Sequence, residues 1–131
     1  MMKFFRRFQD LGLAGAQAKL YDNNTRKHRL EEVKEEAREG AQYIKDGDPV
    51  LEVGSGPGYL SIELAKLGNY KITAMDISND VLKIAGRNAE ENGVEIDFRQ
   101  GNASSLPFDD SMFELIICVL ALKNLKNRLK L

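Results

Sequence analysis

Hydrophobic and polar residues follow two different periods along this chain, and the period changes near residue 48. Upstream, apolar residues recur at three- and four-residue steps between Leu30 and Ile44. This spacing predicts an amphipathic helix that Asn23 or Asn24 could cap. Residues 1–16, which are basic and rich in Phe, are expected to form a surface helix that docks on its own domain. We therefore expect residues 1–47 to form a helical cap, closed by a turn at residues 47–49.

Downstream of residue 48, short β-rich runs alternate with helical stretches. This alternation predicts βαβ units, and hence an α/β domain with a Rossmann-like parallel sheet covered by helices. Ser78 is a suitable cap for one of these helices, and Gly93 can end it in a left-handed conformation. Residues 116–119 lack polar alternation, as expected for a strand covered on both faces. The expected strands are 50–53, 71–75, 94–99 and 113–119, and the expected helices are 59–67 and 79–92.

Composition narrows the choice of partners. The 19 Lys and Arg nearly balance the 20 Asp and Glu, so no overall charge favours nucleic acid or a membrane surface. The apolar run 115–122 is far shorter than the ~20 residues that a membrane-spanning helix needs. Cys118 is the single cysteine, which excludes an internal disulfide and a cysteine-built zinc site. These features favour a cytoplasmic protein of ordinary domain size, with 43% hydrophobic residues to form its core.

Three glycines stand at alternate positions where the first strand of the sheet gives way to a helix: Gly54, Gly56 and Gly58. Ligands of open α/β sheets bind at such junctions, and glycine allows both close approach and positive φ. Ser55 lies within the same loop. The alternative is a tight turn with no ligand, which we disfavour because three glycines in so short a span are costly in conformational entropy.

The spacing of the loop argues against two common nucleotide sites. A dinucleotide fingerprint requires Gly-x-Gly-x-x-Gly, whereas the last glycine comes one position early and Tyr59 follows it. The phosphate-binding pattern of nucleoside triphosphatases is absent as well. Asp76, at the end of the second strand, can accept hydrogen bonds from the ribose hydroxyls of NAD or of S-adenosylmethionine. Its alternative role is a favourable charge near the start of the helix that follows.

Four segments resemble, in order, the motifs of class I S-adenosylmethionine-dependent methyltransferases, particularly those that act on small molecules. They are Leu-Glu-Val-Gly-Ser-Gly-Pro-Gly-Tyr-Leu at 51–60, Ala-Met-Asp-Ile-Ser at 74–78, Gly-Asn-Ala-Ser-Ser-Leu-Pro-Phe at 101–108 and Phe-Glu-Leu-Ile-Ile-Cys at 113–118. The resemblance covers roughly residues 48–120. It implies S-adenosylmethionine as the cofactor and a small molecule as the methyl acceptor.

The resemblance also implies roles for individual residues. The three glycines would line the methionine and ribose part of the cofactor, with Glu52 orienting the loop from below. The remaining predicted contacts are Ser55 in the loop, Asp76 on the ribose, Ile77 on the adenine face, Asn102 and Ala103 at the adenine edge, Cys118 and Val119 near the methionine part, and Tyr21 closing over the cofactor from the cap. No catalytic residue and no metal ligand is assigned.

The sequence departs from the family pattern at three places. The family often has Asp where Asn102 stands, although an amide oxygen can still accept from the adenine amine, and Asp is also usual at Glu114. The family's sheet has seven strands, and the last three are expected to be missing here. If the family's strand order holds, residues 116–119 form an exposed edge, which predicts self-association or pairing with another chain.

Three functions remain open at this point. The first is an active methyltransferase for a small molecule. The second is a remnant or subunit that binds S-adenosylmethionine without turnover. The third, disfavoured by the glycine spacing, is an NAD-binding domain.

Overall fold

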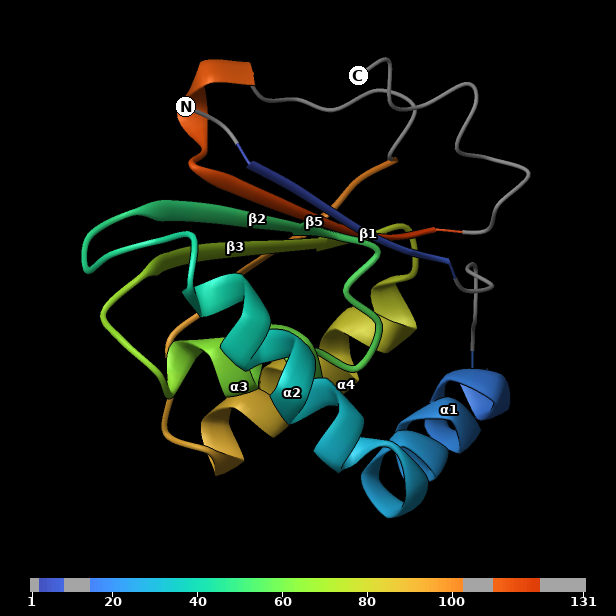
Figure 1. Cartoon of the computed structure of the whole chain (residues 1–131). Coiled ribbons are helices and arrows are strands. Elements are labelled where there is room, and N and C mark those ends of the chain that lie inside the picture. Colours follow the sequence, from blue (N-terminus) through green and yellow to red (C-terminus); the bar gives the residue numbers. More distant parts are fainter. Residues whose placement is uncertain (1–2, 9–14, 103–109, 121–131) are drawn as a thin grey trace.

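The computed structural model describes residues 3–8, 15–102 and 110–120 (Figure 1). These residues form five strands and four helices, and strands and helices alternate from residue 49 to residue 100, as the sequence predicts for its second part. The strands are β1 (Lys3–Phe8), β2 (Pro49–Val53), β3 (Lys71–Asp76), β4 (Asp97–Gln100) and β5 (Leu115–Leu120). The helices are α1 (Gly15–His28), α2 (Leu30–Ala41), α3 (Tyr59–Ala65) and α4 (Asn79–Glu91), with a 3-10 turn, η1, at Asp110–Met112.

The strands form one sheet in the order β1-β5-β2-β3-β4, and every pairing is parallel. The predicted Rossmann-like α/β architecture is thereby confirmed. Figure 1 shows all four helices on the same side of the sheet. Because the strands are parallel, their carboxyl ends meet at one edge, and the loops that follow β2, β3 and β4 are neighbours there.

The hydrophobic core lies between the sheet and helices α2 and α3. Val33 and Ala37 of α2 belong to the same buried cluster as Val50 of β2 and Leu64 of α3. The stripe predicted between Leu30 and Ile44 is therefore the face that α2 packs on the sheet. The other buried members of the cluster are Tyr59, Leu60, Ile72, Leu115 and Ile117.

The start of the chain differs from the prediction. Residues 3–8 form strand β1 rather than a surface helix, and β1 pairs in parallel with β5 from Lys3↔Leu115 to Phe8↔Leu120. The sequence of β1 is rich in aromatic residues, which suit strands, and the edge of β5 offers it a full row of backbone partners. The predicted exposed edge at residues 116–119 is wrong, because β5 lies between β1 and β2. The self-association predicted through that edge loses its basis.

The helical cap also differs in its boundaries. Two helices replace the single one predicted from Asn23 or Asn24, and both asparagines lie exposed within α1. The helices are separated at Arg29, whose φ of −123° and ψ of 1° are not helical. Periodicity missed α1 because few of its residues face a core, so it carries no clear apolar stripe. No helix in the described part of the chain is long and apolar enough to cross a membrane.

Candidate cofactor site

The loop between β2 and α3 depends on glycine. Gly54, Gly56 and Gly58 have φ values of 76°, 56° and 89°, a region that other residues rarely adopt. At Gly58 an added Cβ would also lie 3.1 Å from Cβ of Ala85, on α4. The positive φ that the sequence allowed for is thus present at all three positions, and the entire loop is buried.

Backbone and carboxylate groups of β3 hold this loop in place. The N–H groups of Gly54 and Ser55 both donate to the carbonyl of Met75, at N···O distances of 2.7 and 3.0 Å. Asp76 accepts the N–H of Gly56 on Oδ2 and that of Ser78 on Oδ1, each at 2.9 Å. One buried carboxylate therefore joins the loop after β2 to the loop after β3. A carboxylate oxygen can accept more than one hydrogen bond, which is the chemistry that a ribose contact requires.

Glu52 supports the loop from the side of the helix that follows it. Its carboxylate is 1% exposed, and Oε1 accepts a 2.6 Å hydrogen bond from the hydroxyl of Ser61 on α3. This bond ties the end of β2 to α3, so the turn between them is held at both ends. The structure thus connects Glu52 to the helix after the loop through Ser61, a residue that the sequence analysis did not single out.

The start of α4 follows the sequence prediction. Ser78 is the N-cap, and its hydroxyl accepts the N–H of Val81 at 3.2 Å. At the other end of α4, Gly93 has a φ of 65°, in the left-handed region. The Ser78 cap begins α4 two residues after Asp76, the last residue of β3.

The outer residues of the predicted site surround the same edge of the sheet. Ile77 is 45% exposed directly after β3, and Asn102 is exposed after β4, while Cys118 is fully buried in β5. Gln100 donates from Nε2 to the carbonyl of Ile77 at 3.2 Å, which joins the ends of β3 and β4. The exposed apolar side chain of Ile77 and the exposed amide of Asn102 suit an aromatic base with polar edges.

Three predicted contacts have no described side chain. Ala103 lies outside the described residues. Tyr21 is in α1 and Val119 in β5, but their side chains are not among those described. Their assignment to the cofactor therefore stays a prediction.

A polar cluster that sequence analysis missed lies beneath the loop. It consists of Asp22 and Arg26 of α1, Tyr59 at the start of α3 and Asn88 of α4, and we call it the Tyr59 cluster. Burial, together with donation of its hydroxyl to Asp22, raises the pKa of Tyr59 to about 12. The hydrogen bond to Tyr59 in turn raises the pKa of Arg26. The only signals in the sequence were a Tyr after Gly58 and an Asp and Arg four residues apart on a helix.

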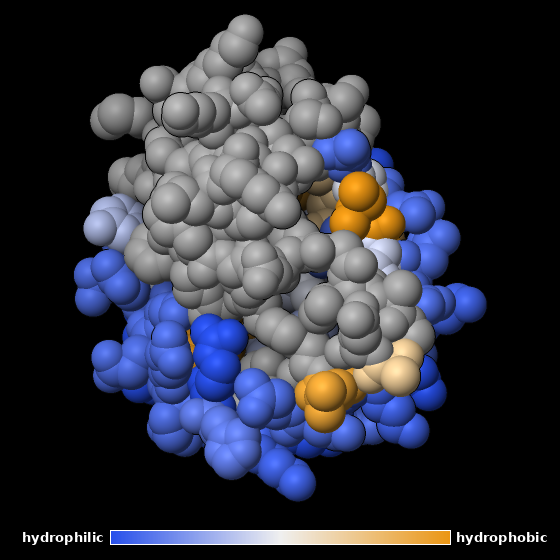
Figure 2. Space-filling model, turned by 90° about the vertical axis from the view of Figure 1, so that its right-hand side faces the viewer, coloured by the Kyte–Doolittle hydropathy of each residue, from blue (hydrophilic) through white to orange (hydrophobic). Residues whose placement is uncertain are grey.

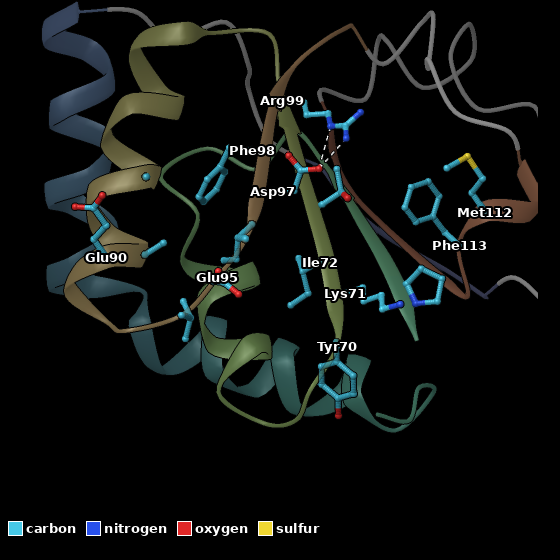
Figure 3. A pocket seen from close by; sticks show the side chains of 16 residues that line it. Tyr70, Lys71, Ile72, Glu90, Glu95, Asp97, Phe98, Arg99, Met112 and Phe113 are labelled. Atoms are coloured by element: carbon cyan, nitrogen blue, oxygen red, sulfur yellow. Dashed lines mark hydrogen bonds and ion pairs between the residues drawn. The ribbon is translucent and has the colours of Figure 1, made fainter. Parts of the chain in front are cut away.

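A groove around the edge strand β4 has a different character (Figure 3). It encloses about 950 Å³ around the edge strand β4, lined in part by Ile72 and Phe98, and it contains none of the predicted cofactor residues. Its charges are mixed, since Lys71 and an ion pair between Arg99 and Asp97 lie near Glu90 and Glu95. It offers neither glycines of positive φ nor a buried carboxylate. Among the described residues no cluster of His, Cys, Asp and Glu could hold a metal ion.

The end of the molecule that carries the strand carboxyl ends and α1 is shown in Figure 2. Its described surface is mostly hydrophilic, with small and separate apolar areas. Exposed apolar side chains of the described chain include Ile77 and, on α1, Leu20.

Comparison with known proteins decides the family. The model of the methyltransferase domain matches residues 50–130, which include the glycine loop, Asp76, Asn102 and Cys118. The chain belongs to this family of S-adenosylmethionine-dependent methyltransferases. The predicted family, fold and cofactor class are confirmed.

Curated relatives of this methyltransferase chain include two ribosomal protein L11 methyltransferases. That of Dictyoglomus thermophilum is 44% identical over 61 residues, which cover 47% of this chain and 20% of the relative. That of Caldicellulosiruptor saccharolyticus is 36% identical over 94 residues, which cover 68% of this chain and 31% of the relative. The chain thus spans about a fifth to a third of the length of these relatives.

Solved structures agree with the family assignment. A protein of Methanococcus maripaludis, assigned as an S-adenosyl-L-methionine-dependent methyltransferase, matches with a TM-score of 0.74 and 25% identity over 84% of this chain and 53% of its own. A second match is magnesium protoporphyrin IX methyltransferase of Synechocystis, crystallised with bound S-adenosylhomocysteine. Its TM-score is 0.60, and the match covers 83% of this chain and 48% of that protein. At 23% identity the second match concerns the fold alone.

Proposed function

We propose that this chain binds S-adenosylmethionine at the carboxyl ends of β2, β3, β4 and β5 and takes part in methyl transfer to a small-molecule acceptor. The observation that carries the proposal is the buried carboxylate of Asp76, 4% exposed, which accepts the N–H of Gly56 and leads directly to the exposed Ile77. A ribose held at Asp76 places the adenine beside Ile77 and Asn102. The glycine loop then receives the methionine part of the cofactor.

The residues of the site have separate tasks in this proposal. Gly54, Gly56 and Gly58 leave room for the cofactor, and Glu52 keeps their loop in place through Ser61. Bound S-adenosylmethionine would supply an electrophilic methyl group, which the acceptor attacks in line while the carbon–sulfur bond breaks and S-adenosylhomocysteine leaves. The chain's contribution is proximity and alignment, which require no obligatory base. Cys118 and Val119 of β5, Ala103 and Tyr21 complete the proposed contacts.

Titration calorimetry with S-adenosylmethionine, S-adenosylhomocysteine and NAD tests the binding part. We expect the first two to bind and NAD not to bind. Gly56→Val and Asp76→Ala should abolish binding while circular dichroism shows that the fold is kept. Binding of NAD alone would contradict the proposal and restore the dinucleotide reading.

The acceptor class is a separate question. The resemblance of the four motifs supports a small molecule, whereas the similarity to ribosomal protein L11 methyltransferases favours a protein acceptor as the second candidate. Transfer of a labelled methyl group to a panel of small molecules, with ribosomal protein L11 as one member, separates the two. Cofactor binding with no transfer to any acceptor would favour the binding-only alternative.

A further inference from the structure

Few of the described side chains of helix α1 are buried. Among its described side chains only Ala18 and Asp22 are buried, while Leu20 is 70% exposed. Helix α2, in contrast, places Val33 and Ala37 in the main core. Polar contacts are therefore prominent among the described contacts of α1.

These contacts converge on one carboxylate and one phenol. The hydroxyl of Tyr59 donates to Oδ1 of Asp22 at 2.7 Å and accepts from Nε of Arg26 at 2.8 Å. Asn88, 2% exposed, donates from Nδ2 to the same Asp22 oxygen at 2.9 Å and accepts from Nη2 of Arg26 at 2.6 Å. Two residues of α1 are thus hydrogen-bonded to α3 and α4 together.

Tyr59 and Asn88, which bond to α1, are also connected to the glycine loop. Asn88 donates from Nδ2 to the carbonyl of Pro57 at 3.0 Å, and Tyr59 follows Gly58 directly in the chain. Pro57 lies between the two glycines whose φ values are 56° and 89°. A shift of the loop would therefore move the groups that hold α1, and release of α1 would remove partners that hold the loop.

We propose that the Tyr59 cluster is a polar latch through which docking of α1 and binding of S-adenosylmethionine stabilise one another. The proposal rests on the function proposed above and adds positioning residues that do not contact the cofactor. Because coupling between two equilibria is reciprocal, a bound cofactor must strengthen the docking of α1 by the same factor by which docking strengthens binding. Buried polar bonds suit such a latch, since they form in only one arrangement of the helices.

Hydrogen exchange of the α1 backbone tests the latch in the free protein. Tyr59→Phe removes the hydroxyl that bonds both Asp22 and Arg26 but keeps the ring in the core. We expect exchange across α1 to become on the order of tenfold faster while β2 and β3 are unchanged. Asp22→Asn, a change on α1 itself, should act in the same direction. Tyr70→Phe is the matched control, because Tyr70 packs partly buried on the same core and is outside the cluster.

Addition of S-adenosylhomocysteine tests the coupling. The ligand should slow exchange of α1 in the wild type and slow it less in Tyr59→Phe, whose affinity by calorimetry should fall by about threefold to tenfold. Equal exchange of α1 in wild type and Tyr59→Phe, or equal acceleration in every strand, would overturn the latch. Absence of binding by the wild type would instead overturn the proposed function and the coupling, while exchange in the free protein still decides whether the cluster holds α1.

Discussion

The glycine loop and helix α1 lie at the same end of the molecule but are held by different means. Backbone N–H groups fix the loop to Met75 and Asp76, and its residues are buried throughout. Side chains of the Tyr59 cluster bond helix α1 to α3 and α4, and most of the described side chains of α1 are exposed. The loop is thus built into the sheet, whereas the helix is attached to it.

This difference indicates that the glycine loop is the more rigid element of the cofactor site and α1 the more adjustable one. A loop bonded through its backbone N–H groups to the sheet keeps these bonds when α1 is released, although it loses the support of the Tyr59 cluster. A helix attached through a few side-chain bonds can be released at a cost of only a few hydrogen bonds, each worth about 1 kcal/mol. We therefore expect loop changes to affect cofactor binding strongly and α1 changes to affect it moderately.

The largest effect on cofactor affinity is expected at Asp76, because this residue of the sheet holds the glycine loop. Asp76→Ala leaves the N–H groups of Gly56 and Ser78 without their acceptor and removes the proposed ribose contacts. Affinity for S-adenosylhomocysteine should fall about 100-fold or more, from loss of about 3 kcal/mol. Asp97→Ala, at an exposed ion pair of β4, is the control and should leave calorimetric affinity unchanged.

A smaller effect is expected at Gly58, and Gly93 provides a matched control. Both have positive φ, so Ala at either position should cost about 1 to 2 kcal/mol in the free energy of unfolding. Only at Gly58 would the new Cβ lie 3.1 Å from Ala85 and beside the site. We expect Gly58→Ala to lower affinity about tenfold and Gly93→Ala to leave it unchanged. Equal affinities for the two variants would contradict a role of the loop in binding.

High pH tests how strongly the Tyr59 cluster stabilises the folded protein. The pKa of Tyr59 is raised to about 12, so the folded state holds this proton more tightly than the unfolded chain, whose tyrosines ionise near pH 10. The stabilisation is complete below about pH 10 and is lost as the pH rises through about 12.

Wild type should therefore lose about 2 kcal/mol more of its free energy of unfolding across this interval than Tyr59→Phe does. Denaturant titration at several pH values measures the difference, and tyrosinate absorbance shows whether one tyrosine ionises late. Parallel losses in both proteins would show that Tyr59 is not protected.

The smallest effect is expected at the exposed border of the cluster. Glu91, 61% exposed, lies 3.7 Å from Nη1 of Arg26. Glu91→Gln should change the free energy of unfolding by less than about 0.5 kcal/mol, because solvent screens such pairs. Exchange of α1 should stay near the wild-type rate. An increase in α1 exchange as large as that of Tyr59→Phe would show that surface charge, rather than the buried hydrogen bonds, holds α1.

The parts of this structure that could be predicted from sequence are those with local signals. Gly54, Gly56 and Gly58 mark a backbone conformation that few other residues adopt, and Ser78 marks a helix start, so the strand, turn and helix order followed directly. Asp76 was placed correctly at the end of β3 beside the loop.

The rest depends on contacts between distant segments. Pairing of residues 3–8 with β5 joins opposite ends of the chain, and no local pattern indicates it. The Tyr59 cluster links Asp22 to Asn88, 66 residues apart, through polar side chains that are usually exposed. Helix α1 was missed because it lacks the apolar stripe on which periodicity depends.

Backbone amide chemical shifts locate bound S-adenosylhomocysteine on the protein. We expect the largest changes on binding at residues 54–58, 76–78 and 102, with Gly56 and Ser78 prominent because their N–H groups bond to Asp76. Smaller changes should extend through α1. Changes confined to the groove around β4, with the glycine loop unaffected, would contradict the central claim that this loop holds the cofactor.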